Sequence, residues 1–183
     1  MDIVTCGWDL SGWEREFYPP DLPADWRLPY FANEFPAVMI PRACWTKADE
    51  SSLRVWSEDV PEGFRFYLEA SGVGADPLGC KLARQGLRGK LAGLVSEAGA
   101  TQPLPASCFQ ILGQADSLPE GGCLPAWPVP NACARDLRAG RAWLESLNTQ
   151  DAGGPGLLVL ASDDIRAEDL RRWWHLLWLM GVA

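Results

Sequence analysis

Apolar residues along the chain follow two patterns, short continuous runs and longer stretches with helical spacing. The short runs predict strands, and they are Asp2 to Cys6, Ala37 to Ile40, Phe64 to Ala70, Cys108 to Leu112 and Leu157 to Ala161. The helical spacing predicts helices, and they cover residues 28–34, 47–58, 133–148 and 166–181, with a further helix marked by Leu78, Leu82, Leu91, Leu94 and Val95. Residues 113–131 contain either one short strand near Ala126 to Val129 or an ordered loop.

The alternation of strands and helices predicts an α/β fold with a largely parallel sheet and right-handed crossovers. A closed barrel of eight β/α units usually takes about 250 residues, whereas this chain has 183. We therefore expect a TIM-barrel-like architecture that is incomplete or shortened, with about five to six parallel strands. The length and the 48% hydrophobic content suit a single α/β domain over residues 1–183.

Charge and cysteine usage restrict the expected partners and compartment. The net charge of −8 disfavours nucleic acid and anionic membranes, because both require a basic surface. None of the six cysteines forms a C-x-x-C pair, and the N-terminus lacks the features of a signal peptide. No apolar run is long enough to span a membrane. We expect a cytoplasmic protein without disulfides, with no bound metal and no cofactor.

Several aromatic and proline positions resemble the opening of the domain-of-unknown-function 72 (YecE-like) family. They are Gly7-Trp8, Trp13, Phe17-Tyr18-Pro19, Leu22-Pro23, Tyr30-Phe31-Ala32, Phe35, Val38, Trp56 and Pro61 to Phe66. The resemblance covers mainly residues 3–70, so residues 1–70 are family-like and residues 71–183 are divergent. It implies a bacterial protein of (β/α)-barrel type and a shortened, degenerate family member, and it implies no established activity.

The chain departs from the family pattern at three places where strands end. Met39-Ile40-Pro41 stands where the family has Glu-Ile-Asn, and Cys44-Trp45 stands where it has Phe-Tyr. Glu69 stands where the family has lysine. A carboxylate, an amide and an amine are therefore absent or reversed in charge, so any catalysis that depends on them is not expected here.

Ligands of parallel α/β folds gather at the carboxyl ends of the strands. At these ends and on the first loop the sequence places a set of candidate ligand-binding residues, which are Trp8, Asp9, Trp13, Tyr18, Arg42 and Glu69. Arg42 could hold a small anionic ligand, the tryptophans could stack on it, and the carboxylates could accept hydrogen bonds. The structural alternative is an Arg42–Glu69 ion pair above tryptophans that pack beneath the loop.

Other acidic and thiol groups support weaker hypotheses. Asp163-Asp164 invites a catalytic interpretation, but one of these residues is better explained as the N-cap of the last helix. Cys6, Cys44 and Cys108 could meet at one barrel end and bind a soft metal, although buried apolar cysteines are the default. His175, the only histidine, lies within the last helix and is expected at a surface or interface.

Three functions remain open at this point. The first is a non-catalytic module that binds a small molecule or a protein. The second is a hydrolase that acts on a phosphorylated small molecule through Asp9, Glu69 and Asp163. The third uses the tryptophan-rich last helix as a docking surface for a second copy or another protein. In that helix Leu170, Trp173, Trp174 and Leu177 are expected in the core, and Trp178 at the interface.

Overall fold

The computed structural model describes residues 1–70, 77–96, 108–112, 123–147, 156–162 and 164–182. Its strands are β1 (Asp2–Thr5), β2 (Ala37–Ile40), β3 (Arg65–Glu69), β4 (Leu91–Ser96), β5 (Cys108–Ile111), β6 (Leu124–Pro128) and β7 (Leu157–Leu160). Its α-helices are α1 (Trp13–Glu16), α2 (Arg27–Ala32), α3 (Arg42–Trp45), α4 (Glu50–Glu58), α5 (Pro77–Leu87), α6 (Asn131–Ala134), α7 (Leu137–Ser146) and α8 (Ala167–Leu179). Two 3-10 helices, η1 (Ala24–Trp26) and η2 (Arg88–Lys90), adjoin α2 and α5.

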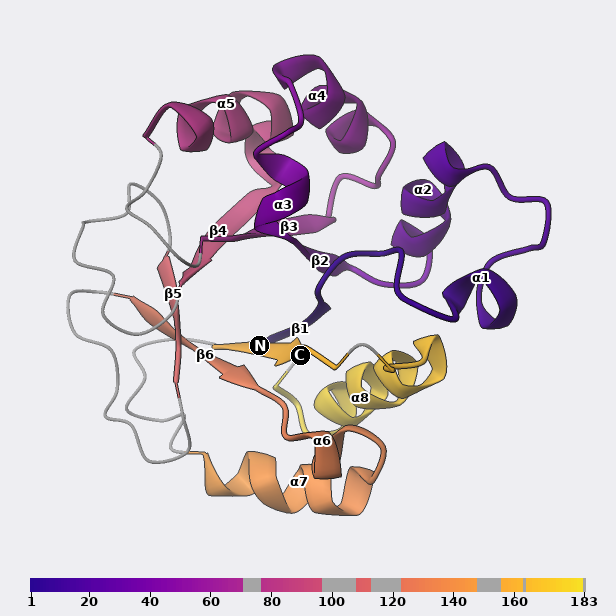
Figure 1. Cartoon of the computed structure of the whole chain (residues 1–183). Helices are drawn as coiled ribbons and strands as arrows, with labels where there is room; N and C mark the ends of the chain where they lie inside the picture. The colour runs from indigo at the N-terminus through magenta and orange to yellow at the C-terminus, as the bar shows by residue number, and fades with distance from the viewer. Residues whose placement is uncertain (71–76, 97–107, 113–122, 148–155, 163, 183) are drawn as a thin grey trace.

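The described strands form a parallel, nearly closed barrel. Their order is β1-β7-β6-β5-β4-β3-β2, and every neighbouring pair is parallel. Figure 1 shows the strands around a common centre, with α2, α4, α5, α7 and α8 outside them. The predicted TIM-barrel-like α/β fold is confirmed, but the structure has seven strands where five to six were expected.

The two ends of the strand order meet between β1 and β2. An isolated parallel bridge joins Cys6 to Met39, and the Gly7 N–H donates to the Met39 carbonyl oxygen at 2.8 Å. Gly7 has a φ of 94°, a conformation that a residue with a Cβ rarely adopts. Glycine therefore lets the chain turn away from β1 directly after the residue that closes the barrel.

The inside of the barrel is a packed core rather than a channel. Side chains alternate along each strand, so every second residue faces inward. The buried inward set is Val4, Ala37, Met39, Tyr67, Val95, Phe109, Ala126, Leu157 and Val159. The Tyr67 and Phe109 rings meet edge to face with centroids 5.3 Å apart. A ligand could therefore bind only outside this packed interior.

A polar network occupies the amino-terminal end of the barrel. Arg65 forms two hydrogen bonds of 2.6 Å to the Asp2 carboxylate, and the Tyr67 hydroxyl donates to the same carboxylate at 2.6 Å. Strand β2 lies between β1 and β3, and its small Ala37 side chain leaves room for these groups to meet across it. Burial raises the pKa of Tyr67, and the Asp2 charge raises it further, so the phenol stays protonated and acts as a donor.

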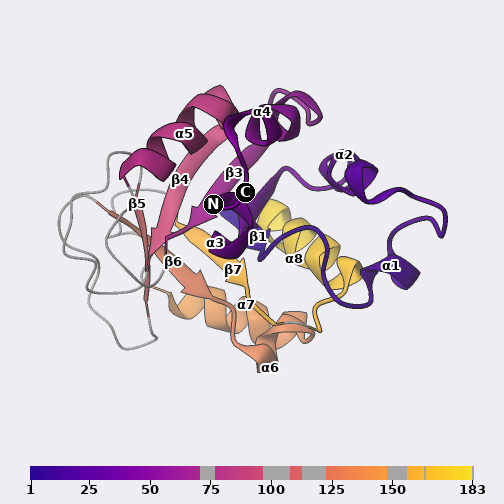
Figure 2. The ribbon, with the colours of Figure 1, turned by 45° about the horizontal axis from the view of Figure 1, so that its top comes forward.

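Helices cover the outer face of the sheet, and α8 contacts both β1 and α7 (Figure 2). Leu170, Trp173 and Leu177 are buried as predicted. Trp174 was expected in the same core, but that prediction is wrong because 39% of it is exposed. In the described part of the chain no helix combines the length and the apolar character that crossing a bilayer requires.

The predicted helix that was to include Leu91, Leu94 and Val95 ends earlier than expected. Helix α5 stops at Leu87, and Leu91 to Ser96 form β4 between β3 and β5. Arg88 has a φ of 51°, which interrupts helical geometry at that point. The apolar residues after Arg88 fit the spacing of a helix and that of a strand equally well, and their pairing with β3 and β5 makes them a strand. Strand β4 is one of the strands that the prediction did not include.

Two further differences concern the segments that follow strands. Residues 131–148 were expected to contain one helix from residue 133, but the chain forms α6 and then α7, which begins after an Asp136 N-cap. Helix α3 was not predicted at all. The open choice for residues 113–131 is decided for Leu124 to Pro128, which form β6, while residues 113–122 lie outside the described residues.

Gly156 offers a test of packing at the start of β7. A Cβ atom there would lie 2.2 Å from Cζ3 of Trp127 and 2.8 Å from the carbonyl oxygen of Pro125. We expect Gly156→Ala to lower the free energy of unfolding by about 1–3 kcal/mol, because backbone and a buried ring must move. Chemical denaturation measures this change. Gly63→Ala is the matched control, since a Cβ there meets nothing within 4 Å, and equal stability of the two variants would contradict the packing.

Candidate functional site

The loop after β1 is anchored by two of the predicted site residues. The buried Tyr18 hydroxyl donates a hydrogen bond to the carbonyl oxygen of Trp8. The Trp8 ring packs edge to face on Trp56 of α4, with ring centroids 5.3 Å apart. Burial is the main reason that the pKa of Tyr18 is raised, so the phenol remains a donor at neutral pH. These contacts bring Trp8 and Tyr18 together as structural partners.

Asp9 takes part in a charged cluster with Arg27 on the surface. The Arg27 guanidinium donates to Asp9 at 2.6 Å and to Glu14 at 2.8 Å. It also lies over the Tyr18 ring, 5.6 Å from the ring centroid. About half of the Asp9 side chain is exposed. Asp9 therefore has a cationic partner, Arg27, which connects the first loop to the start of α2.

Trp13 lies in the core beneath this loop. Its relative exposure is 0%, and its indole N–H donates to the Ile165 carbonyl oxygen at 2.6 Å. It stacks with Phe31 and meets Phe17 edge to face. A completely buried ring offers no face to a ligand on the protein surface, so the structure places Trp13 in packing.

Arg42 and Glu69 meet where β2 and β3 end. The Glu69 carboxylate accepts a hydrogen bond of 2.9 Å from the backbone N–H of Arg42, the first residue of α3. The Trp45 indole N–H donates to the Glu69 carbonyl oxygen at 2.9 Å. The expected proximity of Arg42 and Glu69 is therefore present. The contact from Glu69 is to the main chain, where it ties α3 to β3.

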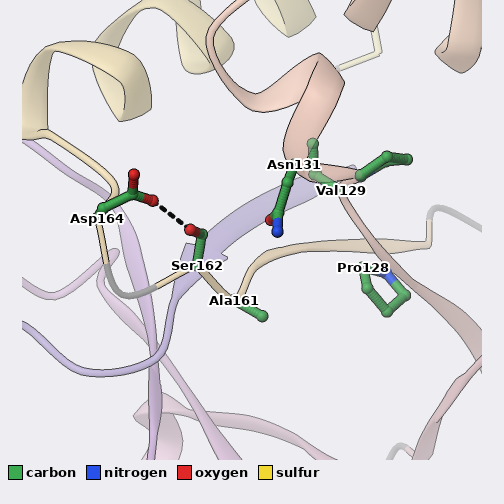
Figure 3. Close-up of a pocket in the computed structure, with 7 residues that line it drawn as sticks. Pro128, Val129, Asn131, Ala161, Ser162 and Asp164 are labelled. Carbon is green, nitrogen blue, oxygen red and sulfur yellow. Dashed lines mark hydrogen bonds between the residues drawn. The ribbon is translucent and has the colours of Figure 1, made fainter.

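An open hollow of about 600 Å³ lies at the carboxyl ends of β6 and β7. Its lining residues are Pro128, Val129, Pro130, Asn131, Ala161, Ser162 and Asp164. Figure 3 shows the Asn131 side chain opposite Ser162, with Asp164 beyond it. The Val129 N–H donates to the Val159 carbonyl oxygen at 2.9 Å and so keeps the two strand ends together. The hollow combines an amide, a hydroxyl and a carboxylate with apolar walls.

Asp164 is the charged group of this hollow. Its carboxylate accepts hydrogen bonds from the Ser162 hydroxyl and, at 2.6 Å, from the Arg135 guanidinium. The Ser162 hydrogen bond is the largest of the effects that lower the pKa of Asp164, and the Arg135 charge adds to it. Asp164 therefore presents a carboxylate at neutral pH.

The predicted helix-capping role of Asp163 or Asp164 is wrong. The N-cap of α8 is Arg166, and the Asp169 carboxylate accepts its backbone N–H at 3.1 Å. The helix therefore begins later than the pair of aspartates, and an acid in its first turn satisfies the N-terminal N–H group. Asp163 itself lies outside the described residues.

The three thiols considered for a metal do not converge. Cys6 follows β1 and Cys44 lies in α3, near the carboxyl ends of the strands, whereas Cys108 begins β5 at the opposite barrel end. Among the residues that the structure describes, no group of three or more His, Cys, Asp or Glu side chains is arranged to hold a metal ion. The first and last residues of a strand lie at opposite ends of the barrel, so Cys108 lies away from Cys6 and Cys44.

Residues 2–73 match the family described as protein of unknown function DUF72. This segment of the chain is similar to the DUF72 family. The match confirms the resemblance that the aromatic and proline positions indicated over residues 3–70. It also means that the strand-end departures at Met39 and Glu69 fall inside the recognised segment. Among curated proteins, no match was found.

Two solved structures of DUF72 family proteins share the fold of the whole chain. One, from Thermotoga maritima, has a TM-score of 0.62 and 10% sequence identity, and the match covers 96% of this chain and 98% of that one. The other, from Enterococcus faecalis, has a TM-score of 0.56 and 11% identity, and it covers 100% of this chain and 98% of that one. The likeness in fold to DUF72 proteins therefore extends beyond residues 2–73.

The hollow contains residues that the sequence analysis did not select. Asn131 and Ser162 come within three residues of the ends of β6 and β7, so the rule that ligands gather at strand ends could have found them. Residues 113–131 lack a clear strand period, so Asn131 had no strand end to mark it, and Ser162 stands next to two aspartates. The Asp9 cluster follows β1, the Arg42–Glu69 contact lies at the ends of β2 and β3, and the hollow lies at the ends of β6 and β7.

The placement of Trp13 can be tested by stability. We expect Trp13→Phe to lower the free energy of unfolding by about 2–4 kcal/mol, because it leaves a cavity and removes the partner of the Ile165 carbonyl oxygen. Thermal or chemical denaturation measures this loss. Trp26→Phe is the matched control, since Trp26 is 64% exposed and its loss should be near neutral. A stable Trp13→Phe variant would restore Trp13 as a candidate for ligand contact.

Proposed function

We propose that this protein is a non-catalytic module that binds a small polar molecule at the carboxyl ends of its barrel strands. The observation that carries the proposal is the hollow at the ends of β6 and β7, where Asn131, Ser162 and Asp164 lie around one space. Strand-end positions are where parallel α/β folds bind ligands. A few polar groups among apolar walls are the composition that small-molecule sites share.

The hydrogen-bonding groups of the hollow favour a ligand that donates hydrogen bonds. The Asp164 carboxylate accepts only, and the Ser162 hydroxyl already donates its proton to it. The Asn131 amide both donates and accepts. Among the described residues that line it there is one carboxylate and no cation, so the hollow suits a neutral polyol or a small amine rather than an anion.

A small anionic ligand belongs to a different part of the same barrel end. Arg42 starts α3 at the end of β2, and its guanidinium is the group there that could pair with an anion. The proposal therefore separates two ligand classes by position. An anion would depend on Arg42, and a polyol or amine would depend on Asn131 and Asp164.

The hydrolase hypothesis has less support from the described residues. General acid–base catalysis requires two groups within hydrogen-bond reach of one substrate. Asp9 is held by Arg27 and Glu69 by the Arg42 backbone, and these contacts are separate. Asp163, the third carboxylate of that hypothesis, lies outside the described residues. Binding without catalysis needs none of these groups to converge, so we favour it.

The hollow can be tested by titration calorimetry with a monosaccharide series, a diaminoalkane series and inorganic phosphate. We expect a polyol or an amine to bind, and Asn131→Ala and Asp164→Asn each to weaken binding at least about tenfold. Asp164 is a surface ion-pair residue, so its replacement should change stability by less than about 1 kcal/mol. Asn33→Ala, an exposed asparagine after α2, is the matched control.

The outcomes of this titration separate the two ligand classes. Binding of phosphate that Arg42→Ala abolishes, with no binding of polyols or amines, would move the site to the ends of β2 and β3. Binding that Asn131→Ala and Asp164→Asn leave unchanged would contradict the hollow. A failure of all three probe classes at millimolar concentration would contradict the binding function.

A second candidate function, self-association through α8, rests on a specific observation. Trp174, Trp178, Leu179 and Val182 are all exposed large apolar residues, with Trp178 61% exposed. The exposed His175 ring stacks on Trp178, with ring centroids 5.9 Å apart. Apolar patches of this kind mark interaction surfaces. Residues 173–182 carry no acidic or basic side chain apart from His175.

We propose a second copy of this chain as the partner for that surface. Two chains that each carry a net charge of −8 repel each other, and contact is least costly where the surface is uncharged. In a symmetric antiparallel pairing of two α8 helices centred on His175, Arg172 of one copy faces Trp178 of the other. This pairing places a guanidinium over an indole ring in both halves of the contact.

Trp178→Ser tests self-association. We expect the native protein to dimerise, and the variant to weaken dimerisation at least about tenfold because an anchor tryptophan is lost from the interface. Sedimentation equilibrium over a range of concentrations measures the dimer dissociation constant. Trp26→Ser is the control, since it removes an equally exposed tryptophan from η1. A native protein that remains monomeric at every concentration would contradict this proposal.

A further inference from the structure

Cys108, the first residue of β5, and Cys123, the residue directly before β6, lie side by side at one end of the barrel. Strands β5 and β6 are parallel, and Phe109 pairs with Leu124. Cys108 and Cys123 are the residues immediately before this pair, so they occupy neighbouring positions on the two adjacent segments. Neighbouring strands are about 4.8 Å apart, which falls within the roughly 4.4–6.8 Å that the Cα atoms of a disulfide span.

The side chains of this pair also meet. The Cys108 and Cys123 thiols are joined by a hydrogen bond, and Ser96 on β4 makes a further side-chain hydrogen bond with Cys108. Both cysteines are free thiols in the structure, Cys108 buried and Cys123 half-buried. A direct contact between two thiols on adjacent strands sets this pair apart from an isolated buried cysteine.

The two thiols differ in their environment. Burial is the main cause that raises the pKa of Cys108 to about 12, and the neighbouring Cys123 raises it further. Cys108 is therefore held as the neutral thiol. Cys123 is more exposed, so it is the sulfur that a small reagent in solution reaches first.

We propose that Cys108 and Cys123 form a reversible disulfide when the protein meets a hydroperoxide. In the first step the Cys123 thiol loses its proton and the thiolate attacks one peroxide oxygen. The O–O bond breaks, Cys123 becomes a sulfenic acid, and the leaving alkoxide or hydroxide takes up that proton to become an alcohol or water. In the second step the Cys108 sulfur attacks the Cys123 sulfur, the S–O bond breaks, and the Cys108 proton leaves with the hydroxide as water.

The two steps balance in atoms and electrons. The two thiols lose two protons and two electrons, and the hydroperoxide takes up both to become one alcohol and one water. A soluble dithiol reverses the change by exchange and becomes oxidised itself. The high pKa of Cys108 slows its attack on the Cys123 sulfenic acid. The contact between the two side chains offsets this, because the reaction is intramolecular.

The disulfide would connect β5 directly to β6. It closes a loop that includes residues 113–122 and restricts the unfolded chain, so the oxidised protein should unfold at a higher temperature. The pair shares no residue with the hollow of Asn131, Ser162 and Asp164, so its formation does not depend on ligand binding. It begins β5 and so lies at the barrel end opposite the hollow.

The test treats reduced native protein with one equivalent of hydrogen peroxide, blocks the remaining thiols with iodoacetamide, and maps the peptides by mass spectrometry. We expect one cross-linked peptide pair that contains Cys108 and Cys123, with the mass of two hydrogen atoms lost and full recovery after reduction. Melting of the oxidised protein should occur at a higher temperature than melting of the reduced protein.

Single variants establish the order of the steps. Cys108→Ser should leave a Cys123 sulfenic acid that dimedone labels, whereas Cys123→Ser should leave Cys108 unmodified. Cys133→Ser, at a buried cysteine of α6, is the matched control and should oxidise as the native protein does. Cys123 is half-buried, so its variant remains informative if Cys108→Ser fails to fold. Native protein in which both thiols stay alkylatable, or in which exposed Cys44 oxidises instead, would overturn the proposal.

Discussion

The closure of the barrel between β1 and β2 is the constraint on which the rest of the structure depends. It consists of one bridge, Cys6 with Met39, and one hydrogen bond from Gly7. Without it, β1 and β2 would be the open edges of a seven-stranded sheet. Closure lets the inward side chains of all strands share one core, and it brings every strand's carboxyl end to the same rim.

The two ends of the barrel have different roles. Because Met39, Tyr67 and Phe109 occupy the centre, polar chemistry is restricted to the two ends of the barrel. At the amino end Asp2 and Arg65 are used for structure. At the carboxyl end the residues after β1 to β3 hold loops and α3 in place, and the residues after β6 and β7 leave an open hollow. Among the described residues, the open space at this rim therefore lies beside the ends of β6 and β7.

In the DUF72-like segment, residues of the family pattern stabilise the fold. Trp13 and Tyr18, which carry the resemblance, stabilise the first loop and the outer core. Glu69, where the family pattern has lysine, is likewise engaged by the Arg42 backbone. The hollow lies outside this segment, in the part of the chain that the family pattern does not cover.

The sequence by itself determined the parallel α/β class, most of the strands, and the buried side of α8 at Leu170, Trp173 and Leu177. These features follow from local periodicity and from burial of apolar area. Only the tertiary structure decided that residues 91–96 form a strand, because pairing with β3 and β5 selects between two compatible periods. It also decided that Trp13 is core, that Asn131 and Ser162 share a hollow, and that Cys108 meets Cys123. Such contacts join residues distant in the chain, and periodicity carries no information on which distant residues meet.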